Sequence, residues 1–295
     1  MRIRRTWTLV SAIALAALCA AATQDEVTFR RDLKPDTKDS YDVTMKGSQV
    51  MEIPGMGEQD MKIDGGYKFA LKIMKVDDKG VAETEIVTSD MQLKMSGSLA
   101  EMMQSAGPEM PKEVVSTAKL DSRYRLTEMK MKGANMQMMI ALGSSSGMSP
   151  FIELPEKGVK VGDTWDISIP ANPMLGDTKN TMLKGTYKGE GKLGEVSGRL
   201  IEMSGSIPFT MDVGKLMEEM AKANPGADPS GGAAGGMKIT ISGTMVVNSS
   251  GILDPTTNKF TYLKSNIKMK TKTDLVDMGM SFDGSGSIDM AMKAN

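Results

Sequence analysis

Methionine is the residue whose type and spacing could support unusual chemistry in this chain. The segment MKMKGANMQMM, residues 129–139, holds five methionines in eleven positions, and the whole chain contains 30. A thioether sulfur is a soft ligand for Cu(I) or Ag(I), and Met-x-Met pairs stand at 129/131, 136/138, 278/280 and 290/292. Methionine is also a flexible apolar side chain that suits a core or an adaptable binding surface. Core packing, apolar ligand binding and soft-metal binding therefore compete as explanations.

Most other catalytic chemistries lack their side chains. The chain has no histidine and a single cysteine, Cys19, so Cys/His zinc sites, Ser–His–Asp catalysis and haem ligation by histidine are not available. GSSSG around Ser145 fits the nucleophile-elbow pattern but has no histidine base. The S-x-x-K matches at Ser116 and Ser265 lack companion motifs. We predict no catalytic residue, no cofactor and no enzymatic activity.

The first 22 residues have the order of a secretory signal peptide. Arginines at positions 2, 4 and 5 precede an apolar stretch at 7–18, and alanines at 20–22 follow. The stretch is too short for a membrane span, so we expect cleavage near Ala22 and a secreted or periplasmic protein with no transmembrane segment. A lipoprotein anchored through Cys19 is less favoured, because the bulky Leu18 stands just before the cysteine.

The charge balance argues against nucleic acid as a partner. Removal of the leader would take away three arginines and no acid, which leaves 33 basic side chains against 37 acidic ones, a net charge of −4. Phosphate backbones require a basic surface, and few aromatic side chains are present to stack on bases.

Alternation of apolar and polar residues with period two indicates strands with one buried face. Tyr67, Phe69, Leu71 and Ile73 share parity, as do Ile201, Met203, Ile207, Phe209 and Met211, and as do Met278, Met280 and Phe282. Turn sequences DDKG (77–80), KGAN (132–135), DPTTNK (254–259) and DGSGS (283–287) separate such runs, and short loops predict antiparallel pairing. The fold class expected is mainly β (α+β), a curved antiparallel sheet or half-barrel in two similar halves with a few short covering helices.

The methionine stretch fits a hairpin in this scheme. A turn at KGAN would place Met131 across from Met136, Met129 across from Met138, and Thr127 across from Ile140. This arrangement predicts one thioether-rich face, which we expect to be core or the lining of a groove.

Two segments break the alternation and predict helices. One lies near 98–119, split by Gly107 and prolines, and the other near 212–224, where Met217 and Met220 belong to an amphipathic face. A small, polar stretch at 224–236 predicts a flexible loop. The expected organisation is a signal peptide at 1–22, an N-terminal β-rich half at 23–149 and a C-terminal β-rich half at 150–295.

The segment ELPEKGVKVGDTW at 153–165 precedes the second half. Its Pro155, Lys157, Val159, Val161, Gly162, Asp163 and Trp165 resemble a Pro…Lys-x-Val-x-Val-Gly-Asp-x-Trp element of uncharacterised secreted bacterial β-rich proteins, where it marks the start of a strand. The layout of a long antiparallel sheet with short helices is similar to half-barrel lipoprotein carriers of the LolA and LppX type. That likeness of architecture implies a hydrophobic ligand under a curved sheet and transfers no functional residue.

The leading hypothesis is a non-enzymatic envelope protein that binds a lipid or other apolar small molecule in a methionine-lined groove. The residues expected to line the groove are Met129, Met131, Met136, Met138, Ile140, Met217 and Met220. The alternatives are a structural or interaction module of the cell envelope without a small ligand, and soft-metal binding by methionine. The sequence does not indicate an oligomeric state.

Overall fold

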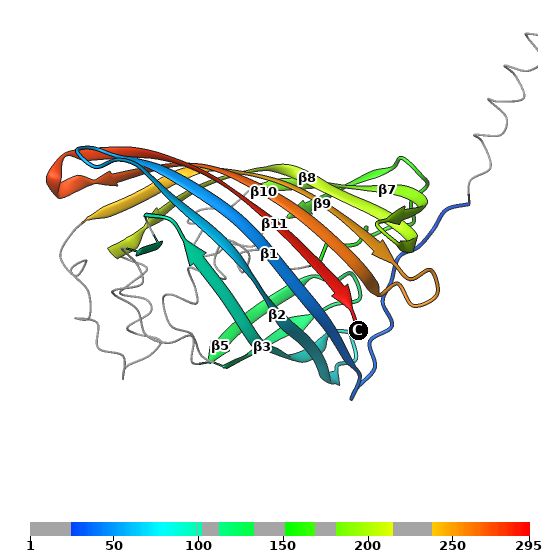
Figure 1. The fold of residues 1–295 in the computed structure, drawn as a ribbon. Coiled ribbons are helices and arrows are strands. Elements are labelled where there is room, and N and C mark those ends of the chain that lie inside the picture. Colours follow the sequence, from blue (N-terminus) through cyan, green and yellow to red (C-terminus); the bar gives the residue numbers. More distant parts are fainter. Residues whose placement is uncertain (1–24, 99, 102–111, 133–150, 169–180, 215–237) are drawn as a thin grey trace, which may run out of the picture.

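One large antiparallel sheet dominates the computed structural model, which describes residues 25–98, 100–101, 112–132, 151–168, 181–214 and 238–295. The sheet is curved into an open arch (Figure 1). Its strands are β1 (Lys38–Ile53), β2 (Gly57–Val76), β3 (Ala82–Ser96), β4 (Glu113–Leu120), β5 (Leu126–Lys132), β6 (Thr164–Ser168), β7 (Met182–Leu193), β8 (Val196–Asp212), β9 (Ile239–Leu253), β10 (Phe260–Leu275) and β11 (Met280–Ala294). The predicted curved antiparallel sheet is confirmed. No helix among these residues is long and apolar enough to cross a membrane.

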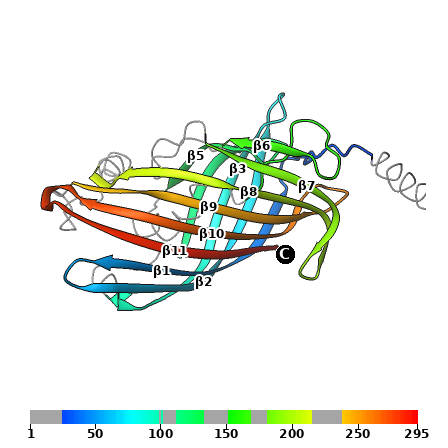
Figure 2. The same cartoon turned by 90° about the horizontal axis from the view of Figure 1, so that it is seen from above.

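The strand order explains how the two parts of the chain share one sheet. The order is β5-β4-β3-β2-β1-β11-β10-β9-β8-β7-β6, so β1–β5 and β6–β11 are two consecutive meanders. They join where the first strand pairs with the last, from Tyr41 opposite Ala294 to Met51 opposite Gly284. Seen from above, β1 and β11 lie side by side in the middle of the arch (Figure 2).

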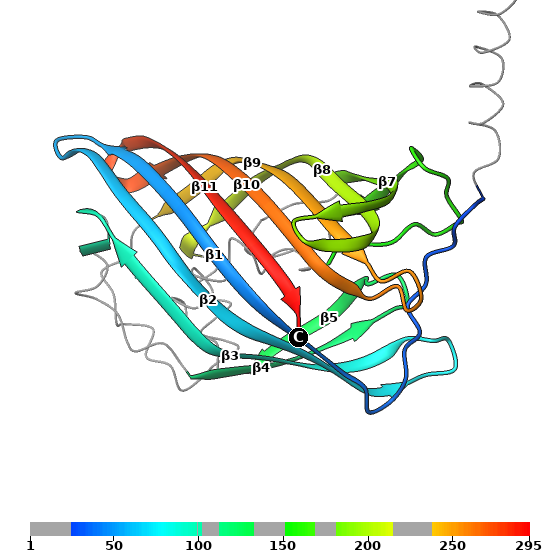
Figure 3. The ribbon, with the colours of Figure 1, turned by 45° about the vertical axis from the view of Figure 1, so that its right-hand side comes forward.

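Period-two alternation gives the sheet a buried concave face and a solvated convex face. On β1, Tyr41, Val43 and Met45 are buried, whereas Asp42 and Thr44 between them are exposed. The β3–β5 end of the sheet curls under the arch and faces the same interior (Figure 3). The core therefore lies inside the curve.

Of the four predicted turns, two are confirmed, one is wrong, and KGAN at 132–135 lies outside the described residues apart from Lys132, which ends β5. DDKG falls between β2 and β3, and DPTTNK falls between β9 and β10. DGSGS at 283–287 lies inside β11, and the real turn is the 3₁₀ helix Val276–Met278, so Met278 is not on the strand with Met280 and Phe282. Gly284 fits a strand here because the Thr271 hydroxyl and the Met51 side chain occupy the space above it, 2.6 and 3.2 Å from where a Cβ would be.

The helix predicted near 98–119 is wrong over its second half, where residues 113–120 form β4. Val114, Ser116, Ala118 and Leu120 are all buried, which is the period of a strand. Ala100 and Glu101 are helical, and 102–111 lie outside the described residues. Of the other predicted helix, Asp212 ends β8, Val213 and Gly214 are helical, and 215–224 lie outside the described residues, as do the loop 224–236, the leader and Cys19.

Aromatic side chains fill one end of the arch. Phe151 contacts the rings of Tyr41, Phe69, Tyr124 and Phe260 with centroid distances of 4.8–6.0 Å. Residues 151, 152 and 154 are at most 3% exposed. We call this the closed end, because residues 151–154 pack against the concave face and fill it there.

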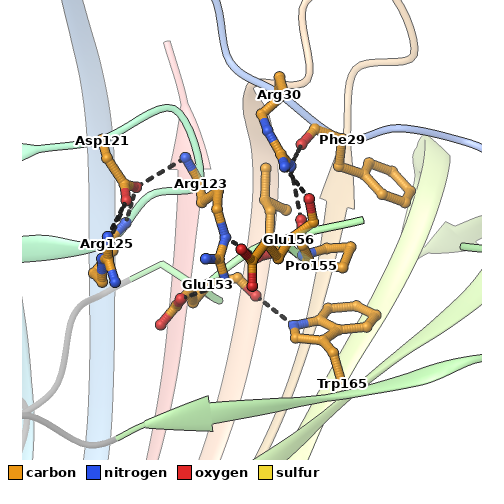
Figure 4. Close-up of polar contacts among 10 residues, drawn as sticks. Phe29, Arg30, Asp121, Arg123, Arg125, Glu153, Pro155, Glu156 and Trp165 are labelled. Atoms are coloured by element: carbon orange, nitrogen blue, oxygen red, sulfur yellow. Dashed lines mark hydrogen bonds and ion pairs between the residues drawn. The ribbon is translucent and has the colours of Figure 1, made fainter. Parts of the chain in front are cut away.

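Polar contacts hold this plug in place (Figure 4). Arg123 donates from Nε to the Leu154 carbonyl (3.0 Å) and pairs with Glu153 at 2.7 Å. The Trp165 indole N–H donates to the Glu153 carbonyl (2.7 Å), and Arg30 donates to the carbonyls of Pro155 (2.7 Å) and Glu156. Burial raises the pKa of the Glu153 carboxyl, against the opposing effect of Arg123.

Candidate functional site

The concave face changes from packed to half-buried along the strands. On β8, Ile201 and Ile207 have no exposed surface, whereas Phe209 and Met211 further along are half-buried. On β10, Leu263 and Ile267 are 2% and 4% exposed, and Met269 is half-buried. Along these positions the exposed fraction of the apolar side chains rises, so the far end of the arch has apolar surface, beside the hydroxyls of Thr271 and Thr273, that the described residues do not fill.

We call this region the open-end patch. It comprises the half-buried, inward-facing Met51, Phe209, Met211, Ile241, Met269 and Phe282. The sheet register brings five of them together across five strands, in a row from Phe209 through Gly243, Thr271 and Gly284 to Met51, and in a second row from Met211 through Ile241 and Thr273 to Phe282. Met269 lies in the next row toward the closed end, between Met245 and Gly286.

Glycines between these side chains make the floor of the patch adaptable. The tip of the Phe209 ring lies 3.1 Å from where a Gly243 Cβ would be, and Met51 covers Gly284 in the same way. Methionine has several rotatable bonds and a polarizable sulfur, so it can repack around different apolar shapes. Thr271 and the buried Thr273 are the hydroxyl groups of the two rows.

The chemistry of the patch is apolar contact. Its six side chains carry no titratable group, and no cluster of three or more His, Cys, Asp or Glu suited to a metal occurs among the residues with described positions. A cleft of about 620 Å³ at the β3 edge is lined by Lys62, Asp64, Leu93, Lys94, Met95 and Ser96. Four of these six side chains are polar and exposed, so the cleft is a poorer candidate for an apolar ligand than the patch.

The residues that the sequence predicts as the lining of a groove are not the residues of the open-end patch. Met129 and Met131 lie on β5, the outermost strand on that side of the described sheet, and the register pairs Met131 with Ser116. Met136, Met138, Ile140, Met217 and Met220 lie outside the described residues. The lining predicted from the sequence therefore stays a prediction.

Of the patch residues, Phe209, Met211 and Phe282 belong to strand faces that the sequence predicts, but the sequence does not mark them as a site. Alternation places Phe209 and Met211, or Met280 and Phe282, on one face, but it does not say how far along a strand the cover extends. That depends on where residues 151–154 pack, which is a long-range contact.

Comparison with known proteins gives only a distant likeness. No protein-family model matches this sequence, and no curated protein matches it. The chain is similar to lipovitellin, in a structure that concerns lipid–protein interactions in lipovitellin, with a TM-score of 0.43 and 10% identity. The match covers 88% of this chain and 25% of the lipovitellin chain, so this chain spans about a quarter of that protein's length.

Proposed function

We propose that this chain is a non-enzymatic, secreted or periplasmic protein that binds a lipid-like or other apolar ligand on the open-end patch. One observation carries the proposal: among the described residues, the aromatic plug fills the concave face at the closed end, whereas the large apolar side chains at the open end are left half-buried. Exposed apolar groups gathered on one concave surface mark ligand or partner sites more often than scattered ones do.

The size of the patch is sufficient for useful affinity. Complete burial of one such side chain contributes roughly 1.5–3 kcal/mol. Six side chains that are already partly covered would contribute on the order of 5 kcal/mol more when a ligand covers them. The ligand's own buried apolar surface adds to this free energy. The loss of translational and rotational freedom on binding opposes it, so we expect dissociation constants in the micromolar range.

Matched charge substitutions test the site. Met211→Glu and Met51→Glu place a carboxylate on the concave face, and Thr210→Glu and Val50→Glu place the same charge one residue away on the convex face. Because a buried carboxylate is costly, the concave variants should bind a fluorescent fatty acid at least about tenfold more weakly than the convex ones.

Circular dichroism and the melting temperature show whether each variant is folded. Equal affinities for a folded concave variant and its convex partner would reject the patch as the site. Absence of any apolar probe binding by the wild-type protein would reject the function and favour an interaction module.

A further inference from the structure

We infer that the turns at the open end of the sheet dock on a neutral, zwitterionic lipid bilayer, from which the open-end patch takes its ligand. The inference rests on the proposed function and adds the source of the ligand and the surface that reaches it. The surface consists of two turns, at 53–57 and 275–280, which we call the apolar tips.

The apolar tips hold the most exposed large apolar side chains of the described structure. Met56, Val276 and Met278 are 54%, 55% and 56% exposed. Glycines form both turns: Gly55, Gly57 and Gly279 have positive φ angles of 82°, 75° and 61°, and a Cβ on any of them would meet no atom within 4 Å. The tips therefore project away from the sheet into open space.

The two ends of the sheet differ in turn chemistry. Turns at the closed end are polar: Asp77 accepts hydrogen bonds from the backbone N–H groups of Lys79 and Val81, and Asp254 accepts them from Thr256 and Thr257. Asp, Asn, Gly and Ser are the usual residues of solvated turns. Exposed methionine and valine at the other end need a different explanation, and contact with an apolar phase supplies one.

The apolar tips lie at the same end of the arch and lead directly to the patch. Strands β1 and β11 pair as far as Met51 opposite Gly284, and the two hairpins separate beyond that pair (Figures 1 and 2). From the tips, β1 continues to Met51 and β11 continues to Phe282. A ligand that leaves a bilayer at the tips would reach the concave face without crossing the convex, solvated one.

The charge around the tips selects the kind of bilayer. Three acids, Glu52, Glu58 and Asp277, stand in or beside the two turns, which contain no lysine or arginine; a fourth, Asp274, is paired with Lys272 at 3.2 Å. Lys238 is adjacent, because its backbone N–H donates to Asp277 and its carbonyl accepts from Val276, and it balances one of the three acids. The surplus of acids would be repelled by anionic lipid and is compatible with zwitterionic lipid.

Vesicle flotation tests the inference with a matched control. The tip variant carries Met56→Ser, Val276→Ser and Met278→Ser, and the control carries Met74→Ser, Met182→Ser and Val246→Ser, which change side chains that are 46%, 44% and 41% exposed elsewhere. The wild type and the control should float with phosphatidylcholine vesicles, and the tip variant should bind them at least about tenfold more weakly. Addition of phosphatidylglycerol should weaken wild-type binding at low salt, and added salt should restore it.

Three results would overturn the inference: no flotation of the wild type, equal loss in the control, or binding that needs phosphatidylglycerol and disappears in salt. The last would point to an electrostatic surface, such as the exposed lysines 264, 268 and 270 on the convex face of β10. The fluorescent fatty acid, supplied without vesicles, separates this inference from the proposed function. The tip variant should bind that probe as the wild type does. A wild type that binds the probe but not vesicles would refute docking of the tips and leave the proposed function unaffected.

Discussion

At the scale of single residues, contacts between aromatic rings and glycines fix the closed end. The Phe260 ring covers Gly251, and the Trp165 ring covers Gly185 so closely that a Cβ there would lie 2.2 Å from the ring. The ring itself is held by its N–H bond to the Glu153 carbonyl. Glycine is therefore required at 185 by the packing of a neighbour and not by its own backbone angles.

Gly185→Ala should consequently destabilise the fold by about 1–3 kcal/mol, because the Trp165 ring must move or its hydrogen bond must break. The measurement is urea unfolding of the single variants and of the double variant with Trp165→Leu. The loss caused by Gly185→Ala should be smaller in the Trp165→Leu background. The same loss in both backgrounds would show that the contact is not the cause.

A buried ion pair is a second group of residues that stabilises the closed end. Arg31, 3% exposed, pairs with Asp39, and Lys259 contacts the other carboxylate oxygen at 2.9 Å. Arg31 also lies over the Tyr124 ring, 5.2 Å from its centroid. The pair joins the N-terminal segment to β1 and to the β9–β10 turn, so it fixes the closed end around the aromatic plug.

At the scale of elements, the closed-end turns are fixed by side-chain caps. Asp254 accepts from the backbone N–H groups of Thr256 and Thr257 and from the Thr257 hydroxyl, at 2.7–3.0 Å. These bonds, first of all the backbone bond from Thr257, hold the pKa of the Asp254 carboxyl below its ordinary value of 3.8. The folded state thus favours the carboxylate, and the resulting stability is present above pH 3.8 and is lost as the pH falls through the lowered pKa.

Asp254→Ala should therefore lower the melting temperature at pH 7 by about 2 °C, as expected for loss of about 1 kcal/mol of hydrogen bonding. The difference from the wild type should shrink in acid, because below pH 3.8 the unfolded chain takes up a proton at this carboxyl and the stabilisation by the carboxylate decreases. Calorimetry at pH 7 and pH 3 measures both values. A difference that grows in acid would contradict the assigned role of the carboxylate.

Elements with local signals could be predicted from the sequence, and those set by distant contacts could not. Alternation from Tyr67 to Ile73 and from Ile201 to Met211 correctly predicted β2 and β8. DGSGS predicts a turn because glycine and serine favour turns, but pairing with β1 and β10 makes it strand. Likewise, the sequence predicts a helix over Val114 and Val115, although pairing with β3 makes them strand.

The candidate site shows the same division. Sequence parity put Phe209, Met211 and Phe282 on inward faces, yet nothing local distinguishes them from Ile201 or Ile267, which are fully packed. Their different cover depends on a plug formed by residues 151–154, more than forty positions before β8 in the chain. A ligand-accessible surface could therefore be assigned only from the assembled sheet.

At the scale of the whole molecule, the two ends of the arch differ in chemistry. The closed end carries the aromatic plug, the buried ion pair and polar turns, and the open end carries half-buried apolar residues and apolar tips. Both meanders share this difference between the ends, because the first and last strands pair side by side from the closed end toward the open end.

The central claim is that the open end of the concave face holds an apolar ligand. Native mass spectrometry of the wild-type protein, purified without detergent and followed by organic extraction, tests it most directly. We predict a bound apolar compound in stoichiometric amount, released by the solvent and depleted in Met211→Glu but not in Thr210→Glu. A protein that shows only the mass of its own chain, with an extract no richer in lipid than the blank, would contradict the claim.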